Sequence, residues 1–176
     1  MKRQLGITAA IATALALTGL TARAANETTV GKIASSDISF VREASASGKE
    51  EVELGRLLTE KATNQQLKDF GRKIMEDHSQ ANDKLARIAS QKGIELASEP
   101  TLGERHELKN LEKLSGEKFD AAARDYAIKD HRADIKRFRD AQTKLQEGDL
   151  KQFVEQTLPV LEEHLRMADQ LKPGPR

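Results

Sequence analysis

The feature that most constrains the fold of this chain is a helical period in its apolar residues. From Ser36 onward these residues recur every three or four positions, which places them on one face of a helix. Capping and helix-breaking residues divide the period into four long segments and a short one, at about residues 37–62, 64–92, 101–114, 119–146 and 149–171. Only 3% of the residues are aromatic, and the apolar ones are mostly leucine, alanine and isoleucine, which favours helices over sheets. We predict an all-α antiparallel four-helix bundle whose short helix bridges the second and third long helices.

Residues that favour helix ends mark these boundaries. Asn64 is expected to cap the second helix, which should end before Gly93. Thr101 is followed three residues later by a glutamate, the spacing of a capping box, and should open the short helix. Gly116 is expected to end that helix, and Asp149 to cap the last one.

The segment 1–24 has the three parts of a secretory signal peptide. A basic start is followed by an apolar run from Leu5 to Leu20 and then by small residues at Ala22 and Ala24. We expect cleavage after Ala24 and export to the periplasm or the medium. No other apolar run approaches the length of a membrane span, so we expect no transmembrane segment in the mature chain. The predicted parts are a signal peptide at 1–24, a flexible segment at 25–35, the bundle at 36–172 and a tail at 173–176.

Charge, cysteine content and missing motifs exclude several classes of function. The chain holds 29 basic and 28 acidic residues, a net charge of +1 that falls to −2 once Lys2, Arg3 and Arg23 are lost with the signal peptide. This balance gives no electrostatic footprint for nucleic acid, so we predict no nucleic-acid partner. The absence of cysteine excludes disulfides and thiolate chemistry and leaves histidine and carboxylate as the main candidate metal ligands. The sequence also lacks a phosphate-binding glycine loop, a nucleophile elbow and an H-E-x-x-H motif, so we favour a binding role over an enzymatic one.

Every long helix carries one ionisable residue on its apolar face. These residues are Glu51, His78, His131 and His164. A buried polar group costs about 1–3 kcal/mol unless it has a partner, so four of them should contact one another or a metal ion. We therefore predict a metal site with these four residues as ligands. The alternative is a metal-free polar network.

Distances from the hairpin turns indicate which of these residues can meet. His131 precedes Gly148, and His164 follows it, by nearly the same number of residues. The two imidazoles should therefore sit at nearly the same level along the bundle. Glu51 and His78 flank the first turn with an offset of roughly 5 Å, which side chains can span. The sequence does not fix the level of one hairpin relative to the other, so convergence of all four residues is a hypothesis.

An acidic residue directly precedes each of the three histidines on the long helices. Asp77, Asp130 and Glu163 are rotated by about 100° from the apolar stripe, which places them at the edge of the core. There each could accept an N–H from the imidazole of a neighbouring helix and orient that ring. The remaining histidine, His106 on the short helix, is expected to be solvated.

Several motifs together resemble the DUF4142 family of exported, ferritin-like helical-bundle proteins. The motifs are Glu51-Val-Glu-Leu-Gly55, Asp77-His78 with Asn82, Phe119-Asp120 with Tyr126 and His131, and Leu158-Pro159 with His164-Leu165. The resemblance implies a ferritin-like fold and export more strongly than it implies an activity. A storage or stress-protective role is the functional expectation for a metal-binding protein of this kind.

The sequence departs from the ferritin-type di-iron pattern, in which a glutamate stands three residues before a ligating histidine on two helices. Met75, Ile128 and Leu161 occupy those positions, so we expect a single ion instead. One carboxylate and three imidazoles suit zinc, iron, copper or manganese. Haem between two histidines is a further alternative, but no covalent attachment motif supports it. The partners left open are a second copy of the chain and an envelope protein.

Overall fold

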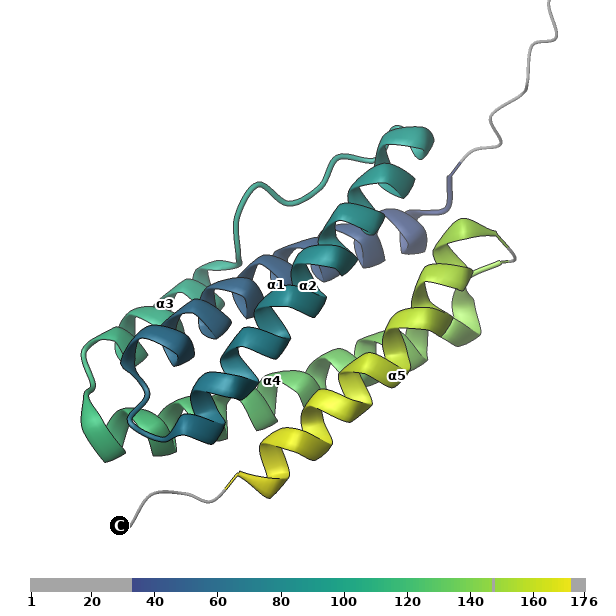
Figure 1. The fold of residues 1–176 in the computed structure, drawn as a ribbon. Helices are drawn as coiled ribbons and strands as arrows, with labels where there is room; N and C mark the ends of the chain where they lie inside the picture. Colours follow the sequence, from purple (N-terminus) through teal and green to yellow (C-terminus); the bar gives the residue numbers. More distant parts are fainter. Residues whose placement is uncertain (1–32, 147, 172–176) are drawn as a thin grey trace, which may run out of the picture. The chain divides into compact units, whose positions relative to one another are not determined.

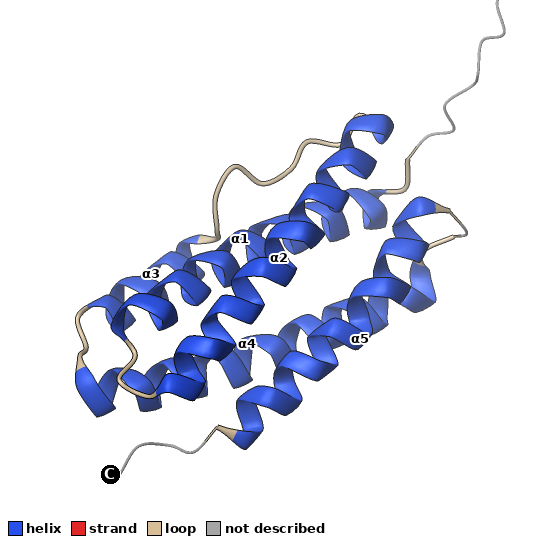
Figure 2. Ribbon diagram, in the orientation of Figure 1, coloured by secondary structure: helices blue, strands red, loops and turns tan. Residues whose placement is uncertain are grey.

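Figure 1 shows a computed structural model of the protein, which describes residues 33–146 and 148–171. The predicted all-α class is confirmed for these residues, which form five helices and no strand (Figure 2). The expected signal peptide, most of the segment 25–35 and the tail at 173–176 lie outside the described residues. The helices are α1 (Ser35–Lys61), α2 (Gln65–Lys92), α3 (Leu102–Glu112), α4 (Gly116–Lys144) and α5 (Asp149–Gln170).

Helix α2 begins and ends where its capping residues predict, and helix α3 begins where its capping box predicts. Asn64 Oδ1 accepts the N–H of Gln66 at 2.8 Å, which satisfies one of the free donors at the start of α2. Gly93 ends α2 in the left-handed conformation, with a φ of 65° that glycine adopts at low cost. Thr101 and Glu104 form the predicted capping box at the start of α3.

The starts of α4 and α5 differ from the prediction. Gly116 does not end the short helix but is the first residue of α4, and its φ of 60° lets the chain turn sharply into the helix. Asp120, expected near the start of that helix, lies inside it and accepts the N–H groups of Thr63 and Asn64, each at 3.0 Å. This contact ties α4 to the turn between α1 and α2. Gly148 occupies the N-cap position of α5, and Asp149 is its first residue.

Each long helix packs against two other long helices. Helix α1 contacts α2 and α4, and helix α5 contacts α4 and α2, so the four long helices enclose a common core (Figure 1). The short helix α3 contacts α1 and α4. Figure 2 shows that the connections from α1 to α2 and from α3 to α4 are short, whereas a longer loop joins α2 to α3.

Glycines allow α1 and α2 to approach closely. A Cβ atom on Gly55 would lie 2.6 Å from the carbonyl oxygen of Gly71, and a Cβ on Gly71 would lie 2.6 Å from Cβ of Leu58. Neither position has room for a side chain, so the two helices touch through their backbones. Glu51 precedes Gly55 by one turn of α1, and this close contact holds that part of the helix against α2.

The buried core consists of two apolar clusters separated by polar residues. One cluster contains the N-terminal parts of α1 and α5 and the C-terminal parts of α2 and α4. The other contains the opposite ends of these helices together with α3. Along each long helix, buried or partly buried polar residues lie between the two clusters. We call them the polar layer: Ser47, Glu50, Glu51, His78, Asp130, His131, Asp134 and His164.

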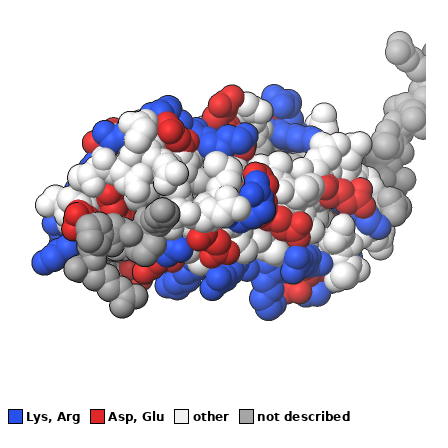
Figure 3. Space-filling model, turned by 60° about the horizontal axis from the view of Figure 1, so that its bottom comes forward, with Lys and Arg blue, Asp and Glu red and all other residues white. Residues whose placement is uncertain are grey.

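Basic and acidic side chains are interspersed over the face drawn in Figure 3. Several form pairs one helical turn apart, such as Arg56 with Glu60 and Lys136 with Asp140. No broad region of a single charge is visible on this face. In the described part of the chain, no helix has both the length and the hydrophobicity needed to cross a membrane.

Candidate metal centre

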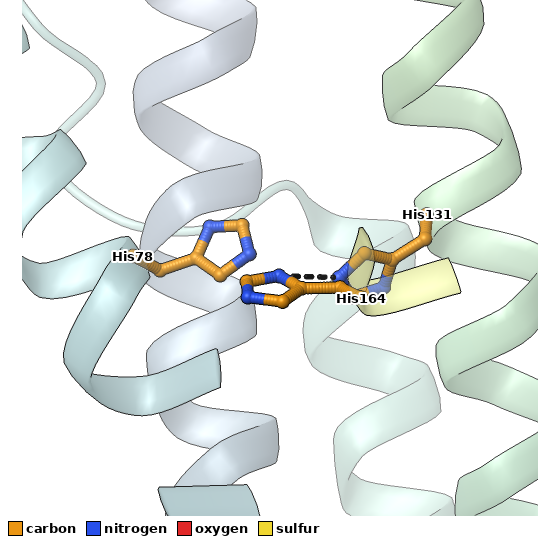
Figure 4. A group of neighbouring side chains, drawn as sticks. All are labelled: His78, His131 and His164. Carbon is orange, nitrogen blue, oxygen red and sulfur yellow. Dashed lines mark hydrogen bonds between the residues drawn. The ribbon is translucent and has the colours of Figure 1, made fainter. Parts of the chain in front are cut away.

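Three imidazoles from three helices meet in the polar layer (Figure 4). The ring centroids of His78, His131 and His164 lie 5.3–5.7 Å apart. All three side chains are buried, and one nitrogen of each lies within 4.8 Å of the corresponding nitrogens of the other two. The structure therefore brings together three of the four residues that the sequence singled out as ligands.

Hydrogen bonds hold two of these rings from their outer sides. His131 Nδ1 lies 2.9 Å from the carbonyl oxygen of Ala127, one turn earlier on α4. His164 Nε2 lies 2.8 Å from Asp77 Oδ2 on α2. The remaining nitrogens, Nε2 of His131 and Nδ1 of His164, face each other at 3.2 Å (Figure 4). Each ring thus binds a partner with one nitrogen and turns the other nitrogen inward.

Asp77 links the imidazoles to the surface. Burial alone would raise the pKa of Asp77, but its hydrogen bonds with Lys73 and His164 outweigh burial and lower the pKa below its usual value. Its carboxylate is therefore ionised at neutral pH and acts only as an acceptor, so His164 Nε2 must carry a hydrogen. The side chain of Asp77 is 17% exposed, and it lines a surface groove of about 430 Å³ between α2 and α5.

These contacts fix the number of protons on the two hydrogen-bonded rings. A carbonyl oxygen can only accept, so His131 Nδ1 carries one hydrogen, as His164 Nε2 does. The contact between the two inner nitrogens requires a third hydrogen, which lies between them. Three protons are one more than two neutral imidazoles hold, so His131 and His164 together carry one positive charge.

Glu51 balances this charge. Its Oε1 atom lies 3.0 Å from Nδ1 of His131, and both side chains are fully buried. Burial alone would raise the pKa of Glu51, but the positive charge of the adjacent His131 lowers it to about 2. Burial likewise opposes a charge on His131, but Glu51 overcomes this effect and raises the pKa of the imidazole.

His78 is the imidazole with an open nitrogen. Its Nε2 atom is buried and has no hydrogen-bond partner. Burial lowers the pKa of His78 to about 4, so the ring is neutral at physiological pH. A neutral imidazole carries a free lone pair on one nitrogen, which is the form that binds metal ions.

Three carboxyl groups gather on the side of His131 from which Glu51 approaches. Glu50, Glu51 and Asp130 each bring an oxygen within 4.8 Å of the others. Both oxygens of Glu50, both of Glu51 and Oδ2 of Asp130 are buried without an aligned hydrogen bond, although Tyr126 lies beside Glu50. Burial and then the repulsion from Glu51 raise the pKa of Glu50 well above its usual value and the pKa of Asp130 to about 10. Glu51 is therefore the ionised member of this group at neutral pH.

Comparisons with known proteins identify the family and support the fold. Residues 22–171 match the family described as "Domain of unknown function (DUF4142)". The chain belongs to this family. No curated protein matches it significantly. A DUF305 protein from Streptomyces coelicolor, whose structure is solved and which is named as a secreted protein, has a TM-score of 0.66 and 16% sequence identity to it, over 77% of this chain and 91% of that chain. At this identity the likeness concerns the fold alone.

The structure places the remaining predicted site residues of this DUF4142 protein in different surroundings. Asp77 contacts an imidazole of a neighbouring helix, as described above. Asp130 instead lies among the carboxyl groups of α1. Glu163 lies at the surface and accepts a hydrogen bond from Arg166 at 2.9 Å on its own helix. His106 is exposed on α3.

Sequence reasoning missed Glu50, which the helical period placed to one side of the core stripe. The structure buries it completely because α1 is covered on more than one side. Helix α3 packs against α1, and the loop that precedes α3 is held by a hydrogen bond from Lys49 Nζ to the Ala97 carbonyl at 2.7 Å. One signal was available in the sequence. Residues 44–48 are all small, and every one of them is buried, which shows that neighbours surround this part of α1.

Proposed function

We propose that this DUF4142 protein binds a transition-metal ion through His78, His131 and His164. The separation of 3.2 Å between the inner nitrogens of His131 and His164 is the observation that carries this proposal. Two nitrogens bound at about 2.05 Å to a tetrahedral ion are about 3.3 Å apart. An ion can therefore take the place of the shared proton at nearly the same separation of the two nitrogens. His78, whose Nε2 atom has no partner, supplies the third imidazole.

The outer hydrogen bonds favour this exchange because they do not involve the inner nitrogens. The Ala127 carbonyl and the Asp77 carboxylate continue to hold their rings after the shared proton leaves. Partners of this kind fix the tautomer of a ligating histidine, and their loss typically weakens metal binding about 10–100-fold. The groove beside Asp77 offers an approach from the surface.

In this proposal Glu51 is not a metal ligand, which is the role that the sequence predicted for it. It meets His131 at the outer nitrogen, which faces away from His164, and it is not among the donors that converge with the three imidazoles. We therefore assign Glu51 the balance of positive charge at the site. The fourth position of a tetrahedral ion is left for water or another small ligand.

The biological setting belongs to the same proposal. We infer that the four long helices form an antiparallel, ferritin-like bundle and that the protein acts in the periplasm or outside the cell after loss of its signal peptide. Zinc, iron, copper and manganese all accept imidazole ligands. One ion per chain suits scavenging of a reactive metal during stress better than bulk storage. A haem between His131 and His164 does not suit this arrangement, because their inner nitrogens are in direct contact.

The metal-free alternative also has an observation in its favour. The hydrogen bonds from Ala127 to Asp77 form a continuous chain, and Glu51 balances the charge of that chain without an ion. On this alternative the protein is a non-catalytic envelope protein that associates with a second copy or another envelope protein. It would then retain no metal.

Metal analysis separates the two functions. Wild-type protein, a His78→Ala/His131→Ala double variant and a His106→Ala control should be purified without added metal and subjected to elemental analysis. We expect about one transition-metal ion per chain in the wild type and the control, and none in the double variant whose circular dichroism shows an intact fold. Equal sub-stoichiometric metal in all three proteins would overturn the proposal and favour the metal-free network.

A further inference from the structure

We propose that Glu50, Glu51 and Asp130 form a second cation site, suited to a hard divalent ion such as Mn²⁺. This inference goes beyond the single ion proposed above. Its donors are all oxygens from α1 and α4, and none of them belongs to the three imidazoles. The two sites are neighbours, because Glu51 of the oxygen cluster contacts the outer nitrogen of His131.

The spacing of the three carboxyl groups fits an ion. One oxygen from each residue lies within 4.8 Å of the other two. Oxygen ligands lie about 2.1–2.6 Å from Mg²⁺ or Ca²⁺, so two donors of one ion are separated by at most about 4.2–5.2 Å. The limit of 4.8 Å lies inside the span for Ca²⁺ and somewhat above that for Mg²⁺, so small side-chain movements bring the three oxygens around one cation. Carboxylate oxygen is the donor that hard ions such as Mg²⁺, Ca²⁺ and Mn²⁺ prefer.

Most oxygens of this cluster also lack hydrogen-bond partners, although Glu51 Oε1 lies 3.0 Å from the His131 imidazole. Five of them are buried without an aligned hydrogen bond: Glu50 Oε1 and Oε2, Glu51 Oε1 and Oε2, and Asp130 Oδ2. Glu50 and Glu51 are both fully buried. An unsatisfied buried acceptor costs about 1–3 kcal/mol, and native proteins contain few of them. A coordinated cation would satisfy most of these atoms at one position.

Charge balance supports a divalent ion in particular. Three ionised carboxylates in this cluster would place three negative charges in the core. The positive charge at the imidazoles, from the shared proton or from an ion that replaces it, compensates the charge of Glu51, which lies 3.0 Å from His131. A divalent cation would compensate the other two. Asp130 and Tyr126 are partly exposed, so the cluster lies near the surface of α4.

Paired metal titrations test this second site. The full mature chain should be stripped with a chelator and saturated with Co²⁺, whose visible absorption reports imidazole ligands. Mn²⁺ is then added, and its uptake is followed by the loss of the free-ion electron paramagnetic resonance signal. We expect the wild type to bind one Co²⁺ and one further Mn²⁺ per chain. Glu50→Gln should weaken Mn²⁺ binding at least tenfold and leave the Co²⁺ spectrum unchanged.

Matched variants keep the two proposals distinguishable. His78→Gln should lose the Co²⁺ spectrum and retain Mn²⁺ binding, and Glu43→Gln, an exposed site on the same helix as Glu50, should change neither. Asp130→Asn provides a second test of the oxygen cluster if Glu50→Gln does not fold. A wild type that takes up no Mn²⁺ after Co²⁺ saturation, or a Glu50→Gln variant that binds Mn²⁺ as the wild type does, overturns the second site. A wild type that binds Mn²⁺ but gives no Co²⁺ spectrum overturns the imidazole site instead.

Discussion

The polar layer contains two groups of ionisable residues that are buried in different ways: the imidazole half (His78, His131 and His164) and the carboxylate half (Glu50, Glu51 and Asp130). In the imidazole half, Ala127 and Asp77 satisfy the outer nitrogens of His131 and His164, and His78 alone has an open nitrogen. In the carboxylate half, five oxygens have no aligned hydrogen bond. The imidazole half is therefore held in place by its surroundings before any ion arrives. The carboxylate half depends on a proton or a cation to neutralise it.

The largest expected effect comes from one substitution made at two adjacent positions. Glu51→Gln removes the charge that balances His131, whereas Glu50→Gln replaces a carboxyl group whose pKa burial raises well above its usual value. Loss of one partner of a buried ion pair typically costs about 3–5 kcal/mol, so we expect Glu51→Gln to lower the free energy of unfolding by about 3 kcal/mol or more. Glu50→Gln should cost less than about 1 kcal/mol, since it keeps the shape and the neutral charge of the protonated group. Urea denaturation at pH 7 in the presence of a chelator measures both, and equal losses would contradict the assigned charges.

The pH dependence of stability provides the next test, through Asp130. Its pKa is about 10 in the folded protein and about 3.9 in an unfolded chain, so between these values only the folded state holds the proton. The stability that this group contributes is complete below pH 4 and is lost as pH rises, by at most about 1.4 kcal/mol per pH unit. The Asp130→Asn substitution removes the carboxyl group that binds this proton. The variant should therefore gain stability relative to the wild type as pH rises.

Urea denaturation of the metal-free proteins at pH 5, 6, 7 and 8 measures this gain. The comparison with the wild type cancels the titration of groups that both chains share. A difference in unfolding free energy that stays constant over this range would show that Asp130 is ionised in the folded protein, and that the carboxylate half is not neutralised by protons.

The sequence predicts the imidazole half better than the carboxylate half for a physical reason. His78, His131 and His164 stand on apolar stripes, and the nearly equal distances of His131 and His164 from their turn indicate their common level. Glu50 stands beside the stripe of α1. Its burial depends on α3 and on the loop before it, whose packing no helical period describes.

The same limit explains two differences within the fold. Both ends of α2 and the start of α3 follow from local capping residues, and the structure has them as predicted. The start of α4 does not, because Asp120 serves the turn between α1 and α2 instead of its own helix end. The sequence also leaves the relative level of the two hairpins open. The packing of α1 against α4 and of α2 against α5 fixes it in the structure.

A smaller effect is expected at the link between the imidazole half and the surface. Asp77→Asn removes the negative charge that holds His164 Nε2, so it should weaken Co²⁺ binding about 10–100-fold without loss of the fold. Asp83→Asn is a matched control, because Asp83 is exposed and lines the same groove farther along α2. Titrations of both variants with Co²⁺, followed by visible absorption, compare their affinities for the ion. Equal affinities would mean that Asp77 does not orient the imidazole.

The most direct test of the central claim is a calorimetric titration of the Glu50→Gln chain with Zn²⁺, because that variant leaves only the imidazole half intact. Titrations in two buffers of different ionisation enthalpy also count the protons released. We predict one Zn²⁺ per chain and the release of about one proton, the one shared by His131 Nε2 and His164 Nδ1. We also predict that adding His78→Gln greatly weakens binding. Absence of binding, or binding that releases no proton and survives His78→Gln, would contradict the claim.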